Sequence, residues 1–334
     1  MAWATVVKMV RRLEAEGYIQ QVGFDESPSV QGPGSVLYDL VDGYPLAIGV
    51  DIEYEYTHAS LVDLRGKVWS QFSCKTPSFA SMLEVVEYCV RVRESIMENQ
   101  PDLEAKTVGL GVAMPLFLVT ERENLFTAVQ SRLAERIDGF VVVDDVARAY
   151  ALHKQHERFD NGSFAVVTIR SGLGLGISVN GRLFRGDENY AGLISHLVLE
   201  PGSGTICPHC GQEGCLETVV NGNLLPESKL GRAEAGDLLA VRDVEGRADA
   251  LARALSFVIL VMNIELIYVA GHFGDSGEFF VSLVNEAMKS YVPPFLPHSV
   301  QAESLAEPRF PIGIAFLVLS NFCNYELGRE PPGH

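Results

Sequence analysis

A cluster of three cysteines and one histidine within residues 192–218 constrains the fold of this chain more than any other feature. Cys207, Cys210 and Cys215 lie within nine residues, and His196 stands eleven residues before the first of them. Thiolates and imidazole are the ligands that zinc prefers, and a closed four-ligand set stabilises a loop that has no hydrophobic core of its own. The spacing therefore predicts a structural zinc site with these four ligands.

Two other interpretations of the cluster are a disulfide and thiols that only fill space. An odd number of cysteines leaves one sulfur without a disulfide partner, and such close spacing is unlike the pattern of core residues. His209 lies inside the same turn and competes for the fourth position, but a ligand from outside the turn closes a larger loop, so we favour His196. Gly211 and Gly214 allow the sharp backbone turns that bring three sulfur atoms to one point.

Composition places the chain among globular proteins. It has 334 residues, 47% of them hydrophobic, which is enough for two or three domains with buried cores. No apolar run approaches the roughly 20 residues of a membrane helix, and we expect no signal peptide and no membrane partner. Cysteines used for metal suit a reducing compartment, so we expect a cytoplasmic protein. The net charge of −17 opposes contact with phosphate backbones.

The residues around the cluster also carry a resemblance. Residues 192–196 read Gly-Leu-Ile-Ser-His, and residues 207–217 read Cys-Pro-His-Cys-Gly-Gln-Glu-Gly-Cys-Leu-Glu. This is similar to the motif of the ROK family (repressors, open reading frames and sugar kinases), which reads Gly-Glu-x-Gly-His and then Cys-x-Cys-Gly-x-x-Gly-Cys-x-Glu. One residue is inserted here between the first two cysteines, and Leu193 and Ser195 replace the glutamate and the glycine. The resemblance implies an α/β fold of two actin-like, ribonuclease-H-like lobes around a cleft.

The segment that follows the first buried strand departs from the kinases of that family. Residues 46–52 form a continuous apolar run with Asp51, and the kinases continue there as Asp-Ile-Gly-Gly-Thr-Lys, a turn that wraps the phosphates of ATP. Here Glu53, Tyr54, Glu55 and Tyr56 follow. Two carboxylates repel a triphosphate and two rings obstruct it, so we expect no binding of ATP or magnesium.

The resemblance also implies a sugar site. Asp145, at the end of the strand 140–143, matches the aspartate that acts as general base in the kinases, and Glu217 matches a glutamate that contacts the sugar. His196 would hold zinc with one ring nitrogen and serve the sugar with the other. Loss of the family's glutamate at Leu193 predicts a weak affinity or a different sugar. The other interpretation of Asp145 is a cap for a helix over 146–156.

The first residues resemble part of a winged helix-turn-helix. A helix over 1–17 precedes short strands at 18–22 and 36–41, and the resemblance places Thr5, Lys8 and Arg12 on a DNA-facing side. We expect the chain to begin inside this module. Gln31-Gly32-Pro33-Gly34 stands where the family carries Gly-Arg-Pro, and residues 1–46 hold three basic residues against six acidic ones. The segment therefore either contacts DNA or has become a packing or dimerisation arm.

Together these features predict four regions: a partial winged-helix arm (1–45), an N-terminal actin-like lobe (46–140), a C-terminal lobe with the zinc loop (141–325) and a disordered tail (326–334). The predicted function is a sugar-responsive transcriptional regulator of the ROK type, a homodimer or homotetramer without kinase activity. One alternative is a sugar kinase that phosphorylates a hexose or an N-acetylhexosamine with Asp145 as base. Another is an interaction protein that kept the fold and lost both ligands.

Overall fold

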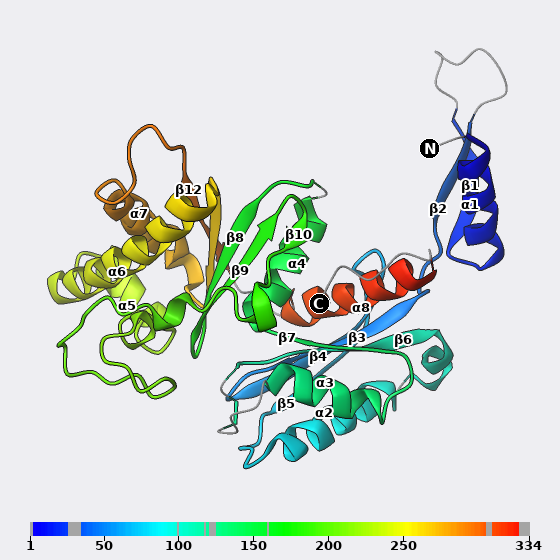
Figure 1. Cartoon of the computed structure of the whole chain (residues 1–334), viewed down its shortest axis with the longest axis horizontal. Helices are drawn as coiled ribbons and strands as arrows, with labels where there is room; N and C mark the ends of the chain where they lie inside the picture. Colours follow the sequence, from blue (N-terminus) through cyan, green and yellow to red (C-terminus); the bar gives the residue numbers. More distant parts are fainter. Residues whose placement is uncertain are drawn as a thin grey trace.

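The computed structural model describes residues 3–25, 35–98, 100–116, 118–119, 125–158, 160–304 and 309–326. Two five-stranded sheets form the centres of two lobes, and a helix with a two-stranded hairpin stands apart from both (Figure 1). Strands and helices mix within each lobe, as the predicted α/β class requires. The wing residues 31–34 and all but the first residue of the predicted tail lie outside the described residues.

The first sheet has the strand order β5-β4-β3-β6-β7. Its members are β3 (Leu46–Ile52), β4 (Tyr56–Asp63), β5 (Val68–Lys75), β6 (Thr107–Ala113) and β7 (Phe140–Asp144). Every residue of β3 is buried, which agrees with its continuous apolar sequence, whereas the edge strand β5 carries exposed residues in alternation. Helices α2 (Met82–Met97) and α3 (Leu125–Ala134) contribute apolar side chains to one core with this sheet, and the 3₁₀-helix η1 (Pro101–Lys106) leads into β6.

The second sheet has the order β10-β9-β8-β11-β12. Its members are β8 (Phe164–Ile169), β9 (Leu173–Val179), β10 (Arg182–Leu183), β11 (Leu266–Gly271) and β12 (Ser299–Ser304). Asn180 and Gly181 take positive φ angles of 51° and 72° and form the hairpin turn between β9 and β10. Helices α5 (Glu227–Glu234), α6 (Leu238–Met262) and α7 (Gly277–Met288) share a hydrophobic core with this sheet. Helix α6 begins at Leu238 because Asp237 caps it with two hydrogen bonds.

Two further helices join the lobes. Helices α4 (Val146–Arg158) and α8 (Arg309–Glu326) share a third core with side chains of both sheets. They approach so closely that a Cβ at Gly313 would lie 1.9 Å from the carbonyl oxygen of Ala149. Helix α8 also packs on β3 and β6, and β7 pairs with β6 in the first sheet. The division into four regions stays a prediction.

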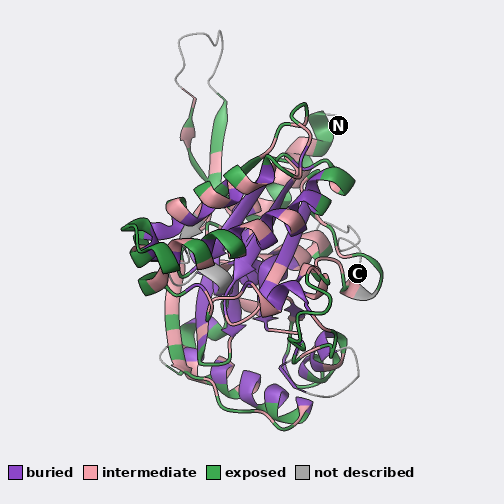
Figure 2. Ribbon diagram, turned by 90° about the vertical axis from the view of Figure 1, so that its left-hand side faces the viewer, coloured by how far each residue is buried: buried purple, intermediate pink, exposed green. Residues whose placement is uncertain are grey.

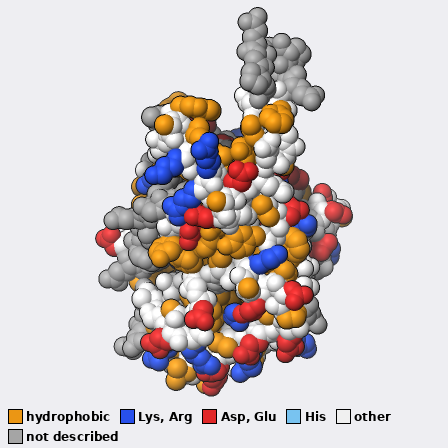
Figure 3. Space-filling view, turned by 90° about the vertical axis from the view of Figure 1, so that its right-hand side faces the viewer, with side chains coloured by type: hydrophobic (Ala, Val, Ile, Leu, Met, Phe, Trp, Pro, Cys, Tyr) orange, Lys and Arg blue, Asp and Glu red, His pale blue; other side chains and the backbone are white. Residues whose placement is uncertain are grey.

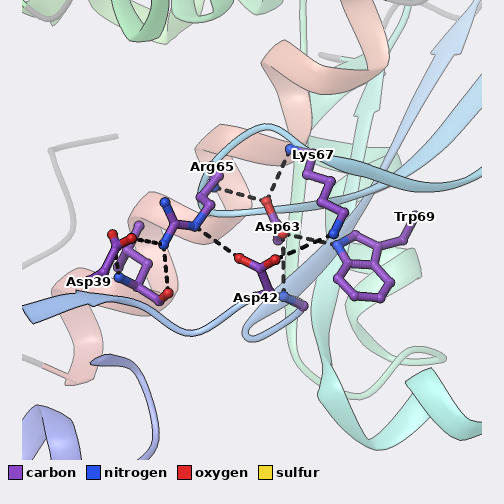
Figure 4. A network of polar contacts seen from close by, with 8 residues as sticks. Asp39, Asp42, Asp63, Arg65, Lys67 and Trp69 are labelled. Carbon is purple, nitrogen blue, oxygen red and sulfur yellow. Dashed lines mark hydrogen bonds and ion pairs between the residues drawn. The ribbon is translucent and has the colours of Figure 1, made fainter. Parts of the chain in front are cut away.

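The N-terminal arm (residues 3–40) consists of α1 (Trp3–Ala15), β1 (Ile19–Phe24) and β2 (Val36–Leu40). None of the described residues of α1 is buried, and Figure 2 shows the arm largely exposed. Tyr18 stacks on Tyr44 with ring centroids 5.4 Å apart and meets Phe322 of α8 edge-on. Arg65 in the β4–β5 turn also holds the end of the arm, through ion pairs of 2.7 Å to Asp39 and 3.1 Å to Asp42 (Figure 4).

None of the helices in the described part of the chain combines the length and the apolar character that crossing a bilayer requires.

Candidate functional site

The four residues of the predicted metal cluster converge on one point. The ligand atoms of His196, Cys207, Cys210 and Cys215 all lie within 4.8 Å of one another. The sulfur of Cys207 lies 3.7 Å from Nδ1 of His196, and the sulfurs of Cys210 and Cys215 lie 3.4 Å apart. Zinc–sulfur bonds of about 2.3 Å at tetrahedral angles place two sulfur atoms roughly 3.8 Å apart, so the donor set fits a zinc ion with small adjustments.

The backbone of residues 205–215 explains how the sulfurs meet. The amide of Cys207 donates to the carbonyl of Gln212 at 2.8 Å, and the amide of Gly211 donates back to the carbonyl of Cys207 at 3.0 Å. Gly211 and Gly214 have φ angles of 76° and 73°, which other residues rarely adopt. At Gly214 a Cβ would also lie 2.0 Å from the carbonyl oxygen of Glu200. The glycines therefore make the turn that the sequence predicts.

A cavity lies at the junction of β7, α4 and the cysteine loop, and we call it the β7–α4 cavity. It is small, about 90 Å³, and it brings together carboxylates, hydroxyls, two guanidiniums and apolar side chains. Its carboxylates include two of the predicted sugar-binding residues, Asp145 and Glu217. Other lining residues are Tyr54, Leu116, Phe126, Arg148, Thr168, Arg170, Leu175, Tyr190, Leu193, Ser195 and His209.

Asp145 has two structural roles. Its Oδ1 accepts a hydrogen bond of 2.8 Å from the amide of Ala147, so it caps α4 as the alternative interpretation expected. It also lines the cavity. Burial raises the pKa of Asp145, while Arg148 lowers it and Asp144 raises it. Asp145 thus both caps α4 and lines the cavity.

Glu217 approaches the cavity from the 3₁₀-helix η4 (Leu216–Thr218), directly after the cysteine loop. Burial raises the pKa of Glu217 to about 7. Oε1 of Glu217 lies 3.6 Å from Nε2 of His209, and burial lowers the pKa of His209. The cysteine loop thus supplies cavity residues as well as the possible metal ligands. His196 is in the metal cluster but is not among the residues that line the cavity.

A second hollow, the β3–β8 cleft, lies between the ends of these strands and has a volume of about 750 Å³. Arg170, which follows β8, crosses it and makes a two-fold ion pair with Asp51 of β3, with N–O distances of 3.1 and 2.9 Å. Its Nε lies 2.7 Å from Oε1 of Glu53. Arg170 and Asp51 are 7% and 1% exposed, so this ion pair is buried and joins the two lobes.

The rest of the β3–β8 cleft is acidic and aromatic. Burial raises the pKa of Glu53, Arg170 lowers it and Asp51 raises it. Beyond these three residues the lining includes Tyr54, Glu55, Tyr56, His58, Glu227, His272 and Phe273. The carboxylates therefore stand at the turn where the sequence predicts no triphosphate, and the guanidinium of Arg170 is already occupied by carboxylates.

The three residues predicted to face DNA lie exposed on α1: Thr5, Lys8 and Arg12. They are not all available, because Arg12 lies 2.7 Å from Glu16 and 3.6 Å from Glu326 of α8. On the face that carries the arm, Lys and Arg side chains lie close to Asp and Glu, and hydrophobic side chains form a band across the middle (Figure 3). Several blue side chains gather at the upper left of this face, with Asp and Glu side chains directly beside them (Figure 3).

Sequence reasoning missed two arginines of these sites. Arg170 ends an apolar strand and stands just before the Ser-Gly turn, a place where a charge is unusual. Arg148 falls between Ala147 and Ala149 on an otherwise apolar first turn of α4. A charge within a buried apolar pattern was the available signal, because such a residue is retained only with partners.

Comparisons with known proteins show what this chain is similar to. The model of the ROK family matches residues 47–320. A glucokinase from Thermotoga maritima is 25% identical over 314 residues, which cover 81% of this chain and 96% of that protein. A xylose repressor from Bacillus spizizenii is 20% identical over an alignment 350 positions long, and the alignment covers 96% of this chain and 88% of that protein.

Among solved structures, a ROK family transcriptional regulator, a homologue of the Escherichia coli MLC protein, matches with a TM-score of 0.78 at 19% identity. The match covers 95% of this chain and 88% of that chain. Similarity at this level shows the shared fold, so the predicted two-lobed, actin-like architecture is confirmed. With the family model spanning both lobes, the chain belongs to the ROK family.

Proposed function

We propose that this protein is a sugar-responsive transcriptional regulator that has no kinase activity. The observation that carries the proposal is the buried ion pair of Arg170 with Asp51 and Glu53 in the β3–β8 cleft. Phosphoryl transfer depends on positioning and neutralising the phosphates. Here the turn after β3 carries the carboxylates of Glu53 and Glu55, and the guanidinium that could neutralise phosphate is held by two carboxylates.

The β7–α4 cavity supports the sugar part of the proposal. Asp145 and Glu217 place carboxylate oxygens where they can accept hydrogen bonds from hydroxyls, and Tyr54, Tyr190 and Phe126 provide ring surface around them. A sensor needs these acceptors as much as an enzyme does. A hydroxyl-binding site is selective because its buried polar groups stay unpaired when the wrong ligand enters.

The arm supports the regulator part. The matched region of the xylose repressor covers 96% of this chain, whereas that of the glucokinase covers 81%. The arm also contacts the body at the end of α8, through Phe322 and Glu326. Helix α8 packs on α4, whose first residues line the cavity. We propose that a ligand in the cavity shifts α4 and α8 and thereby the arm.

We further propose that the four-residue cluster holds a structural zinc ion. Four protein ligands, Cys207, Cys210, Cys215 and His196, leave no position for a substrate or an activated water. Zinc would fix the loop that carries His209 and Glu217 against the cavity. Loss of the ion would then weaken ligand binding without touching the ligand directly.

The arm is the proposed DNA-contacting segment, with Thr5, Lys8 and Arg12 on its exposed helix. Its acidic excess predicts weak DNA binding that falls steeply as salt is added. Binding as a homodimer or homotetramer would raise the affinity by placing two or more arms on one duplex. Light scattering on the purified protein measures that state.

The test combines three measurements on the full chain. Isothermal titration with Mg-ATP and with a panel of hexoses and N-acetylhexosamines should show a sugar that binds and no binding of ATP. An assay for sugar-dependent ADP release should stay at background. Gel-shift experiments at low and moderate salt, with DNA from upstream of its own coding sequence, should show a complex that the bound sugar alters. Sugar-dependent ADP release would refute the proposal.

A sugar kinase is the second candidate, because Asp145 stands in the cavity at the carboxyl end of β7 and a glucokinase is among the relatives. In that case Asp145 would take the proton of the attacking hydroxyl. ADP release that depends on sugar and disappears in Asp145→Asn would establish this function instead.

A further inference from the structure

The three cysteines of the metal cluster differ in their access to solvent. All six cysteines of the chain lie in its described part, and Cys210 is the exposed one among them. Cys207 and Cys215 are only 1% and 0% exposed. Buried structural cysteines are inert towards oxidants, whereas an exposed thiolate reacts. Cys210 is therefore the residue at which a dissolved oxidant reaches this cluster.

A second sulfur lies beside that of Cys210. The sulfurs of Cys210 and Cys215 are 3.4 Å apart, and a disulfide requires about 2.05 Å, so bond formation brings the two atoms closer by roughly 1.4 Å. Both residues belong to one turn, in which Gly211 and Gly214 adopt positive φ angles. The movement is thus local to the cysteine loop. A buried thiol next to an exposed one is the arrangement of a resolving cysteine beside a reactive one.

Cys207 and Cys210 are the alternative pair, because they have the Cys-x-x-Cys spacing. The sulfur of Cys207, however, lies 3.7 Å from Nδ1 of His196, whereas the sulfur of Cys210 contacts that of Cys215. The contacts of the loop favour the pair Cys210 and Cys215, and peptide mapping can tell the two pairs apart.

We propose that Cys210 is a site of reversible oxidation, at which a peroxide produces a disulfide with Cys215 and the zinc ion leaves. The inference rests on the proposed zinc site and adds a modification that controls it. Zinc-bound cysteines are thiolates, so no separate base is needed to activate the sulfur of Cys210. The disulfide removes two of the four ligands. Only Cys207 and His196 then remain, which is too few for a structural site.

The reaction consumes one peroxide and two thiolates. The sulfur of Cys210 attacks one oxygen of hydrogen peroxide, the O–O bond breaks, and a sulfenic acid forms while hydroxide leaves and takes up a proton to become water. The sulfur of Cys215 then attacks that of Cys210, the S–O bond breaks, and a second hydroxide leaves and is protonated. The two sulfurs lose two electrons and the peroxide gains them, so no further oxidant is required.

Oxidation would affect the β7–α4 cavity through the same loop. His209, which lines the cavity, directly precedes Cys210, and Glu217 follows Cys215 by two residues. Formation of the disulfide and loss of the metal therefore move the segment that supplies both cavity residues. We expect the affinity for the ligand of the cavity to fall about tenfold, as the loss of one buried polar partner allows.

The first test uses the zinc-loaded full-length protein and hydrogen peroxide. A metallochromic dye follows released zinc, and a chromogenic thiol reagent counts the remaining thiols. We expect the zinc and two thiols to disappear together, and dithiothreitol with added zinc to restore both. The control combines Cys74→Ser with Cys323→Ser, which removes the two half-buried thiols outside the cluster and should leave the response unchanged. Zinc that stays bound while the thiols react would overturn the proposal.

Peptide mapping identifies the disulfide. Cleavage after Glu213 separates Cys215 from the other two cysteines of the cluster, so a disulfide to Cys215 joins two peptides. A disulfide between Cys207 and Cys210 stays within one peptide. Alkylation before cleavage should label Cys207, and fragmentation in the mass spectrometer locates that label. A disulfide that includes Cys207, or a sulfonic acid at Cys210 without a disulfide, would overturn the assignment.

A substitution at Cys210 tests the role of its thiol. Cys210→His keeps four zinc-binding side chains, in the Cys₂His₂ set that many structural sites use, and removes the exposed thiol. This variant should bind zinc and release it at least about tenfold more slowly in peroxide, because its remaining sulfurs are buried. An unchanged rate of release would overturn the role of Cys210. If Cys210→His purifies without zinc, the peptide map of the unmodified protein decides.

The outcomes separate this inference from the proposed function. Thiol counts, zinc release and the peptide map involve no sugar, so they decide the oxidation site even if no sugar binds. Absence of sugar binding by the reduced protein would overturn the sensing function alone. Equal affinity before and after oxidation would overturn the effect on the cavity. A reduced protein that purifies without zinc would overturn the release of metal.

Discussion

The β7–α4 cavity and the β3–β8 cleft share four wall residues, Glu53, Tyr54, Arg170 and Ser171, yet they differ in size and in chemistry. The cleft, about 750 Å³, is large enough for a nucleotide, because ligand pockets run from about 300 to 1,000 Å³. The cavity is about 90 Å³ and suits only a compact ligand. Charge rather than space therefore argues against a triphosphate in the cleft.

The two sites differ most in how their arginines are paired. In the cleft, carboxylates on the turn after β3 and one arginine after β8 neutralise one another across the lobes. In the cavity, Arg148 is held by Asp144 and by the carbonyl of Ala191, while Asp145 and Glu217 are among the lining residues. In the cleft the arginine is paired with carboxylates, whereas in the cavity two carboxylates line a small space. Each of the following changes tests one side of that contrast.

Loss of the metal cluster should have the largest effect. Structural zinc sites contribute about 10 kcal/mol or more in small zinc domains, so Cys207→Ser should abolish bound zinc, lower the thermal midpoint and weaken sugar binding. Metal analysis and thermal unfolding measure this. Cys74→Ser, outside the cluster, is the control and can keep the contact with Tyr88. A purified protein without tightly bound zinc would contradict the prediction.

Breaking the ion pair in the cleft comes next. Arg170→Met leaves Asp51 buried without its partner, and removing one member of a buried pair destabilises by about 3–5 kcal/mol. Urea unfolding should show this loss, and adding Asp51→Asn should recover part of it. Arg182→Met should change the free energy of unfolding by less than about 0.5 kcal/mol. An equally small effect at Arg170 would mean that the pair does not hold the lobes together.

The packing of α4 on α8 should respond to a single methyl group. Gly313→Ala places a Cβ 1.9 Å from the carbonyl oxygen of Ala149, so the helices must separate. We expect a cost of about 1–3 kcal/mol and a weaker effect of sugar on DNA binding. Gel shifts with and without sugar measure the second quantity. Gly246→Ala, where a Cβ meets no atom within 4 Å, is the control. Unaltered coupling would refute the proposed route to the arm.

Asp145→Asn separates the cap from the ligand contact. Asparagine caps helices about as well as aspartate, so the free energy of unfolding should change by less than about 0.5 kcal/mol. Affinity for the sugar selected by the panel should fall about tenfold, because the charged acceptor is lost. Titration calorimetry and urea unfolding give the two values. A change confined to stability would leave Asp145 as a cap alone.

The smallest expected effect is that of Mg-ATP. Because the cleft is lined by carboxylates and its arginine is paired, millimolar Mg-ATP should leave the thermal midpoint unchanged. The same should hold for Arg170→Met, which removes the cation and leaves the carboxylates. Stabilisation by Mg-ATP with glucose present would show that the cleft still accepts a nucleotide.

Much of the fold could be predicted, because apolar residues recur at the spacing of a strand or of a helix along each element. The strands of the first lobe, helix α4 and the Asn180–Gly181 turn all follow from local pattern. Helix α5 and strand β12 are not among the elements that the sequence predicts. Strand β12 reads Ser-Val-Gln-Ala-Glu-Ser and is weakly apolar, so its place in the sheet depends on pairing with β11.

The sequence by itself determined the metal cluster, because three of its ligands lie within one turn and two glycines with positive φ set the geometry locally. It also showed that the turn after β3 carries two carboxylates and two rings, from which we predict that a triphosphate does not bind there. Tertiary structure alone decided the partners of the arginines. Asp51 and Arg170 are 119 residues apart, and Arg148 meets Ala191 from another loop. Folding brings buried charges next to residues that are distant in the sequence, and the local sequence pattern does not specify which residues these are.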